Sequence, residues 1–133
     1  MTGLDTNIVL RYLLKDDARQ SPKAQRVVNA LSARNPGWIA VATMLEVAWV
    51  MKSKNRASRA QTADVLELLL SADAIVVEQS ELLARAIKRF RSCRAGFVDC
   101  LIAETAAQAG CNKILTFDEI AARDLGMELV SAS

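Results

Sequence analysis

Short apolar runs alternate along this chain with longer stretches in which apolar residues recur three or four positions apart. The short runs are expected to form buried strands at residues 1–4, 38–42, 74–78, 113–117 and 127–130. The sequence between them lacks the two-residue turn signals of β-hairpins. Strands that alternate with helices in this way are typical of a parallel sheet with helices on both faces.

Helical spacing of apolar residues, together with capping and breaking residues, predicts where the helices lie. Helices are expected over residues 7–14, 21–31, 43–51, 58–70, 80–90 and 98–109, with a short one after Asp118. Ser21, Ser58 and Ser80 are predicted N-caps, and Pro22 fits the first helical position after Ser21. Gly110 is expected to end the sixth helix in a left-handed conformation.

Composition is consistent with one soluble α/β domain spanning residues 1–133. The chain has 133 residues, is 52% hydrophobic and 5% aromatic, and contains 5 Gly and 2 Pro, which favours closely packed helices over an all-β fold. No apolar run approaches the roughly 20 residues of a membrane span, and no secretory leader is recognisable. We therefore expect a cytoplasmic protein that does not enter a membrane.

Cysteine and histidine usage narrows the possible chemistry. Cys93, Cys100 and Cys111 lack the spacing of a zinc site, and the chain has 0 His. The three cysteines are interpreted as packing residues. Without histidine, Ser-His-Asp, Cys-His and histidine acid–base mechanisms are excluded. Catalysis would have to depend on carboxylates, lysines or a hard metal ion.

Four acidic residues stand next to apolar runs, where a charge is costly unless it has a role. Asp5 follows the first predicted strand, Glu46 lies in the first helical turn after the second, and Asp118 ends the fourth. Asp99 lies in the first turn of its predicted helix. The carboxyl ends of parallel strands share one edge of a sheet, so the four carboxylates are expected to meet there. Such a cluster would be destabilising unless Mg²⁺ or Mn²⁺ neutralised it.

Each acid also has a purely structural interpretation, which the sequence leaves open. Asp5 and Asp118 could cap the helices that follow them, and Asp99 could favour the positive end of a helix dipole. Thr43 and Glu46 fit the S/T-x-x-E capping box. The recurrence of acids at the ends of successive strands is the observation that capping alone does not explain.

Four motifs together resemble the PIN domain over essentially the whole chain. They are L-D-T-N at the start, E-V-A-W-V, D-C-L-I-A-E-T-A and I-L-T-F-D. More narrowly, these motifs resemble the VapC-type toxins of bacterial toxin–antitoxin pairs, which have about this length. The resemblance implies a three-layer α/β/α sandwich with a central parallel five-stranded sheet.

The resemblance also implies a Mg²⁺- or Mn²⁺-dependent endoribonuclease that holds one or two ions. The acidic pocket would consist of Asp5, Glu46, Asp99 and Asp118, with Glu119 as an alternative to Asp118. Polar residues that would orient ligands or a water are Asn7 and Thr116. Metal-bound water would hydrolyse the RNA phosphodiester without any histidine.

Partners follow from the same resemblance. It implies an RNA substrate, a small cognate VapB-like antitoxin that holds the toxin inactive, and a homodimer. The alternative is a noncatalytic PIN-like module that binds protein or RNA. A dehalogenase-type phosphatase would need an acid where Asn7 stands, and a receiver domain would need adjacent acids after its first strand.

Two basic runs flank the predicted acidic pocket, although the net charge is only +2. Both runs are predicted to guide RNA. The residues predicted to bind RNA are Lys52, Lys54, Arg56 and Arg59 in the first run and Arg91 and Arg94 in the second. The second run also contains Arg85, Lys88 and Arg89. The alternative for either run is an ordinary solvated surface. Trp38, Trp49 and Tyr12 could stack on bases, but their spacing favours the core.

Overall fold

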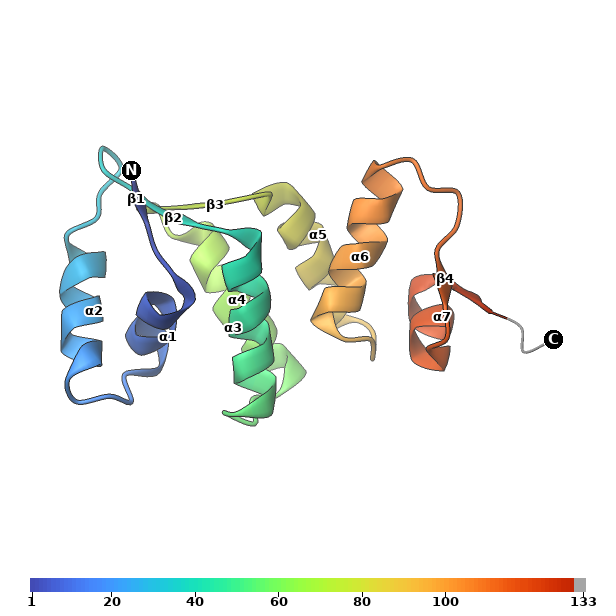
Figure 1. Ribbon diagram of the computed structural model, residues 1–133, viewed down its shortest axis with the longest axis horizontal. Coiled ribbons are helices and arrows are strands. Elements are labelled where there is room, and N and C mark those ends of the chain that lie inside the picture. Colours follow the sequence, from blue (N-terminus) through green and yellow to red (C-terminus); the bar gives the residue numbers. More distant parts are fainter. Residues whose placement is uncertain (131–133) are drawn as a thin grey trace. The chain divides into compact units, whose positions relative to one another are not determined.

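Two compact units, divided after Ser80, make up the computed structural model, which describes residues 1–130. Each unit contains one small sheet, and the paired strands are parallel in both. Figure 1 labels the helices and strands of the two units. The α/β class and the parallel pairing are therefore confirmed, and the single domain over residues 1–133 stays a prediction.

The sheet of the first unit has three short strands. They are β1 (Thr2–Gly3), β2 (Gly37–Ile39) and β3 (Ile75–Val77), in the order β1-β2-β3. After β1, the Leu4 amide donates to the Trp38 carbonyl at 2.9 Å, which extends the pairing to the residue before Asp5. Gly37 is needed for close packing, because an added Cβ would lie 2.8 Å from the Leu31 Cδ1 and 2.9 Å from the Leu4 Cδ1.

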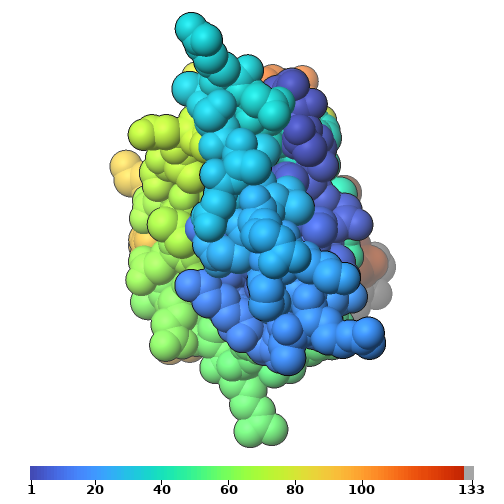
Figure 2. All heavy atoms as spheres, turned by 90° about the vertical axis from the view of Figure 1, so that its left-hand side faces the viewer, coloured from blue at the N-terminus to red at the C-terminus, as the bar shows by residue number. Residues whose placement is uncertain are grey.

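Four helices belong to the first unit. They are α1 (Thr6–Leu14), α2 (Gln20–Asn29), α3 (Val41–Ser53) and α4 (Arg59–Ser71). Helices α1 and α2 follow each other in the chain and contact each other. In Figure 2, the residues of α2 lie on the face turned to the viewer. The core of this unit is formed by fully buried side chains such as Ile39, Met44, Val47 and Leu66.

The N-terminus of α2 differs from the prediction. The helix begins at Gln20, so Ser21 and Pro22 lie inside its first turn, and Ser21 is not the N-cap. Asp17 satisfies the helix start instead, because its Oδ1 accepts hydrogen bonds from the amides of Arg19 at 2.9 Å and Gln20 at 2.7 Å. The buried Ser21 hydroxyl accepts from the Asp17 amide at 3.2 Å. By contrast, Ser58 caps α4 as predicted, in a capping box with Gln61.

Helix α3 begins two residues earlier than predicted, and this overturns one interpretation of Glu46. Its N-cap is Ala40, which offers no side-chain hydrogen bond, and Glu78 from the end of β3 accepts from the Val41 amide at 2.9 Å. Thr43 is therefore inside the helix. The capping box proposed for Thr43 and Glu46 is wrong, and the Glu46 carboxylate is left for other interactions.

The second unit, as far as Val130, packs three helices with a two-stranded sheet. Its elements are α5 (Ser80–Arg91), α6 (Phe97–Gln108), β4 (Leu115–Thr116), α7 (Glu119–Leu125) and β5 (Glu128–Leu129). The rings of Phe90 and Phe97 meet edge to face at 5.7 Å and join α5 to α6. Gly110 ends α6 with φ 89°, as predicted.

Strand length is where the sheet departs most from expectation. Within residues 1–130 the five predicted strands exist, but each has only two or three paired residues. Strands β4 and β5 pair with each other in a sheet separate from β1-β2-β3, so two small sheets stand in place of the predicted central five-stranded sheet. The first run is weak because M-T-G-L offers few β-branched residues and contains Gly3. Among residues 1–130, no helix is both long and apolar enough to cross a membrane.

The cysteines divide into two groups. Cys100 is fully buried and Cys93 is half-buried, with 3.7 Å between their Sγ atoms, so both fit the predicted packing role. Cys111 is exposed beyond the end of α6, and its predicted packing role is wrong. The reason is local, because α6 ends at Gln108 and Cys111 follows Gly110, whose φ is 89°.

Candidate active site

A hydrogen bond between helices α1 and α3 connects the regions of two predicted acids in the first unit. The Thr6 hydroxyl donates to the Glu46 Oε1 at 2.8 Å, across 40 positions of sequence. Thr6 directly follows Asp5, so the start of α1 and the middle of α3 are held against each other here. Both Asp5 and Glu46 are exposed, and water or an ion can therefore reach their carboxylates.

Asp5 is the N-cap of α1, and capping leaves part of its carboxylate available. Its Oδ1 accepts a hydrogen bond from the Ile8 amide at 3.0 Å, while its backbone is extended. Among residues 1–130, no hydrogen bond is recorded to Oδ2. The capping interpretation of Asp5 is thus confirmed, and it is compatible with metal binding through the second oxygen.

Thr6 is the residue of this region that the sequence reasoning missed. Its half-buried hydroxyl lies between Glu46 and the buried Thr43, whose Oγ1 is 3.5 Å away. A hydroxyl has one proton, and the shorter contact to a charged acceptor is the stronger one. Thr6 therefore orients Glu46. The sequence signal for this role is the position of Thr6 directly after the first predicted acid.

Asn7 faces a different neighbour. Its side-chain amide donates to the Gln20 Oε1 of α2 at 3.4 Å, and the same oxygen accepts from the Arg11 Nε at 2.8 Å. This contact connects α1 with α2. The role of Asn7 in orienting a ligand or a water stays a prediction.

In the second unit, Asp118 and Thr116 form a local turn after β4. The Thr116 hydroxyl accepts from the Asp118 amide at 3.0 Å, and the Asp118 Oδ1 accepts from the amides of Ile120 at 2.7 Å and Ala121 at 3.0 Å. Asp118 is thus the N-cap of α7, and Thr116 fixes the backbone that carries it. Within residues 1–130 both recorded bonds use Oδ1, as at Asp5, while Glu119 is exposed in the first turn of the helix.

Asp99 is carried by a well-anchored corner between α5 and α6. It lies in the first turn of α6, whose N-cap Gly96 makes no side-chain hydrogen bond. The next residue, Cys100, is fully buried, and the Arg94 amide of the preceding turn donates to the Asp124 carboxylate at 2.7 Å. Within residues 1–130, no hydrogen bond or ion pair is recorded for the half-exposed Asp99 carboxylate.

The four predicted acids are divided equally between the two units, Asp5 and Glu46 in the first and Asp99 and Asp118 in the second. Over residues 1–130, no three acidic or cysteine side chains form a group that could hold a metal ion. The donor chemistry nevertheless fits Mg²⁺ or Mn²⁺, because each unit presents two accessible carboxylates and these ions prefer hard oxygen ligands. The convergence of all four acids stays a prediction.

The two basic runs differ in how their side chains are used. In the first run, Lys52, Lys54 and Arg56 are exposed at the end of α3 and in the connection to α4. In the second, the Glu104 carboxylate of α6 pairs with the Arg89 Nε at 2.7 Å and the Arg85 Nε at 3.4 Å. Arg85 and Arg89 therefore hold α5 against α6.

For the remaining members of the basic runs, the role in guiding RNA stays a prediction. Lys88, Arg91 and Arg94 are exposed, and Arg59 is half-buried at the start of α4.

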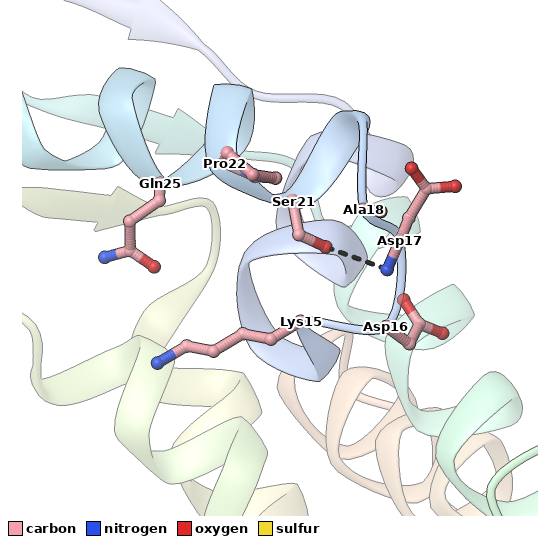
Figure 3. A pocket seen from close by; sticks show the side chains of 7 residues that line it. All are labelled: Lys15, Asp16, Asp17, Ala18, Ser21, Pro22 and Gln25. Atoms are coloured by element: carbon pink, nitrogen blue, oxygen red, sulfur yellow. Dashed lines mark hydrogen bonds between the residues drawn. The ribbon is translucent and has the colours of Figure 1, made fainter.

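A shallow pocket of about 690 Å³ lies at the connection between α1 and α2, away from the predicted acids of this unit. Figure 3 shows its lining, with the Asp16 and Asp17 carboxylates on one side and the Lys15 and Gln25 side chains on the other. The Asp17 amide donates a hydrogen bond to the Ser21 hydroxyl at 3.2 Å, which closes this turn.

Comparison with known proteins gives the family. No curated protein is significantly similar in sequence to the chain. Among solved structures, it is weakly similar to the crystal structure of FitAcB from Neisseria gonorrhoeae, with 15% identity, a TM-score of 0.38, and 98% of this chain and 97% of that chain covered. The profile of the PIN domain matches residues 4–124, a range that includes all four predicted acids. The chain therefore belongs to the PIN domain family.

Proposed function

We propose that this protein is a metal-dependent endoribonuclease that hydrolyses RNA phosphodiester bonds with an activated water. PIN domains are generally metal-dependent nucleases, and the family match spans the four acids. The observation that carries the proposal is the hydrogen bond from Thr6 to Glu46, because it fixes a carboxylate of α3 beside the helix start that carries Asp5.

Asp5, Glu46, Asp99 and Asp118 are the proposed metal ligands. One or two Mg²⁺ or Mn²⁺ ions would supply a more acidic bound water and offset the charge that develops on the phosphate. The chain's own residues prepare this chemistry. Asp5 and Asp118 are fixed by the helices they cap, and Thr6 orients Glu46.

The more specific part of the proposal is that this protein is the toxin of a toxin–antitoxin pair and is similar to VapC-type toxins. It is supported by the four motifs that carry the resemblance. The proposal includes RNA as the substrate, a small antitoxin as an inhibitory partner, a homodimer, and action in the cytoplasm. Exposed basic side chains at Lys52, Lys54 and Arg56 are suited to an RNA backbone.

Cleavage of end-labelled RNA by the purified full chain tests this function. Activity is expected with Mg²⁺ or Mn²⁺ and should disappear with EDTA. Asp5→Asn and Asp99→Asn should each reduce kcat/KM by more than the 10–100-fold typical of losing an outer partner of a metal site. Asp73→Asn removes one exposed charge outside the predicted site and serves as the matched control.

Two results would contradict the proposal. One is full activity of either Asp5→Asn or Asp99→Asn, which would remove these acids from the mechanism. The other is an inactive wild-type chain that still binds RNA with metal present, which would favour the noncatalytic module. Growth arrest on expression, relieved by Asp99→Asn, would support the toxin assignment, and harmless expression would contradict it.

A further inference from the structure

Trp49 is exposed, although its spacing in the sequence predicted a core position. It is 59% exposed on α3, while its neighbours Val47 and Ala48 are buried. Trp38 and Tyr12 are half-buried, so the prediction fails specifically at Trp49. Trp side chains are enriched at interfaces, because the ring offers a large apolar face while the indole N–H can stay hydrogen-bonded.

The exposed positions of α3 form one stripe along the helix. They are Ala42, Glu46, Trp49, Lys52 and Ser53. Trp49 follows Glu46 by three residues, so the two lie on the same side of the helix about 4.5 Å apart along its axis. Lys52 lies the same distance beyond Trp49. The stripe thus presents a proposed metal ligand, an aromatic ring and a cation in succession.

A positive charge lies over the Trp49 ring near the end of the helix. The Lys54 Nζ lies 5.7 Å from the centroid of the Trp49 ring, and Arg56 is exposed in the following connection. An exposed cation–π contact is weaker than stacking of a nucleic-acid base on an aromatic side chain. A base can therefore take the place of the ammonium on the ring, and the released lysine can then pair with a phosphate.

From this arrangement we infer that Trp49 is a stacking platform for an unpaired base of the bound RNA. The inference rests on the proposed nuclease function and adds a binding residue to it. Lys52, Lys54 and Arg56 bind the phosphates on one side of the stacked base, while Glu46 lies on the other side of Trp49, toward α1. A base within a duplex is already stacked and offers no free face to the ring.

Fluorescence of Trp49 tests the inference directly. The chain contains 2 Trp, so Trp38→Phe leaves Trp49 as the sole indole, and Asp99→Asn in the same full-length chain prevents cleavage. Oligouridine should quench this emission, whereas the duplex of oligouridine with oligoadenosine should quench it weakly. Trp49→Ala should raise the Kd for oligouridine about 5- to 150-fold, the range for losing one stacked base.

Controls separate stacking from general apolar contact. Trp49→Phe retains an aromatic face and should recover most of the affinity. Leu68→Ala removes a side chain that is 58% exposed on α4, nearly equal to Trp49, and should leave the Kd unchanged. Circular dichroism should give the same melting temperature for all variants, because neither side chain is buried.

The outcomes distinguish failure of this inference from failure of the proposed function. Metal-dependent cleavage by the wild type, with an unquenched Trp49 and an unchanged Kd in Trp49→Ala, overturns the stacking inference alone. Quenching of Trp49 by oligouridine, together with a wild-type chain that does not cleave RNA with metal present, supports stacking and rejects the nuclease. If Trp49→Ala converts an oligomer to monomers while the Kd stays the same, the ring is a protein contact and the inference is wrong.

Discussion

The hydrogen bond between Thr6 and Glu46 gives the sharpest prediction for the candidate active site. Thr6→Val keeps the β-branched shape and removes the hydroxyl that donates to the Glu46 Oε1 at 2.8 Å. Because Glu46 is exposed, water replaces much of the lost bond, and the expected cost in the free energy of unfolding is about 0.5–1 kcal/mol.

The expected effect on catalysis is larger than the effect on stability. Groups that orient metal ligands typically contribute 10–100-fold to metal affinity or activity, which corresponds to about 1.4–2.7 kcal/mol. Thr6→Val should therefore lower kcat/KM by this factor while the melting temperature falls by no more than about 5 °C. Raised Mg²⁺ concentration should restore part of the activity, since the ligand itself remains.

Cleavage assays across a Mg²⁺ titration, paired with thermal unfolding, measure both quantities. Thr105→Val is the matched control, because the Thr105 hydroxyl bonds to the backbone of its own helix at Leu101. It should leave the Mg²⁺ dependence unchanged. A Thr6→Val enzyme with the same kcat/KM and Mg²⁺ dependence as the wild type would refute the idea that Thr6 orients a catalytic carboxylate.

Three further predictions concern how the first unit is held together. Glu78→Ala should destabilise the chain by about 1 kcal/mol in denaturant titrations through loss of the α3 cap, while Glu78→Gln retains an acceptor and should cost much less. Gly37→Ala should cost about 1 kcal/mol in the same measurement, because its methyl group would meet two leucine Cδ1 atoms at 2.8 and 2.9 Å. Hydrogen bonds from the backbone amides lower the pKa of Asp17, the one from Gln20 more than the one from Arg19. The Asp17 carboxylate therefore stabilises the fold above its ordinary pKa of 3.8, and this stabilisation is lost as pH falls through the lowered pKa. Below about pH 4, the free energy of unfolding of Asp17→Asn should fall less steeply with decreasing pH than that of the wild type. Identical pH profiles for the two proteins would contradict this role of Asp17.

Apolar periodicity was sufficient to predict the order of helices and strands. Over residues 1–130, the seven helices and five parallel strands correspond to the predicted elements, because their apolar positions pack in the cores of the two units. The boundaries that failed depended on residues distant in sequence or on a competing cap. The start of α3 is set by Glu78, which is 37 positions away from Val41, and the start of α2 is set by Asp17 rather than Ser21.

Site residues could be predicted only where their chemistry is local. Asp5 and Asp118 follow strands and cap helices, so their positions could be read from adjacent residues. Thr6 acts on Glu46 across 40 positions, a relation that requires α1 and α3 to be placed in space. Trp49 was misassigned because helical spacing shows which residues share a face, but not whether that face is covered.

Capping and metal binding were treated as competing interpretations of the acids, and the structure indicates that they are compatible. A carboxylate has two oxygens, and both Asp5 and Asp118 use Oδ1 for the amides of the helix they begin. The cap fixes the side chain without consuming Oδ2, so ordering the ligand costs less conformational entropy when an ion binds.

Replacing Asp5 by Asn keeps an oxygen that can cap α1 and removes the charge, whereas Ala removes both. If the two roles are separate, Asp5→Asn should lose metal-dependent cleavage at nearly wild-type stability, and Asp5→Ala should lose about 1 kcal/mol of stability in addition. Equal stability loss in the two variants would mean that the charge itself, and not the capping hydrogen bond, maintains the start of α1.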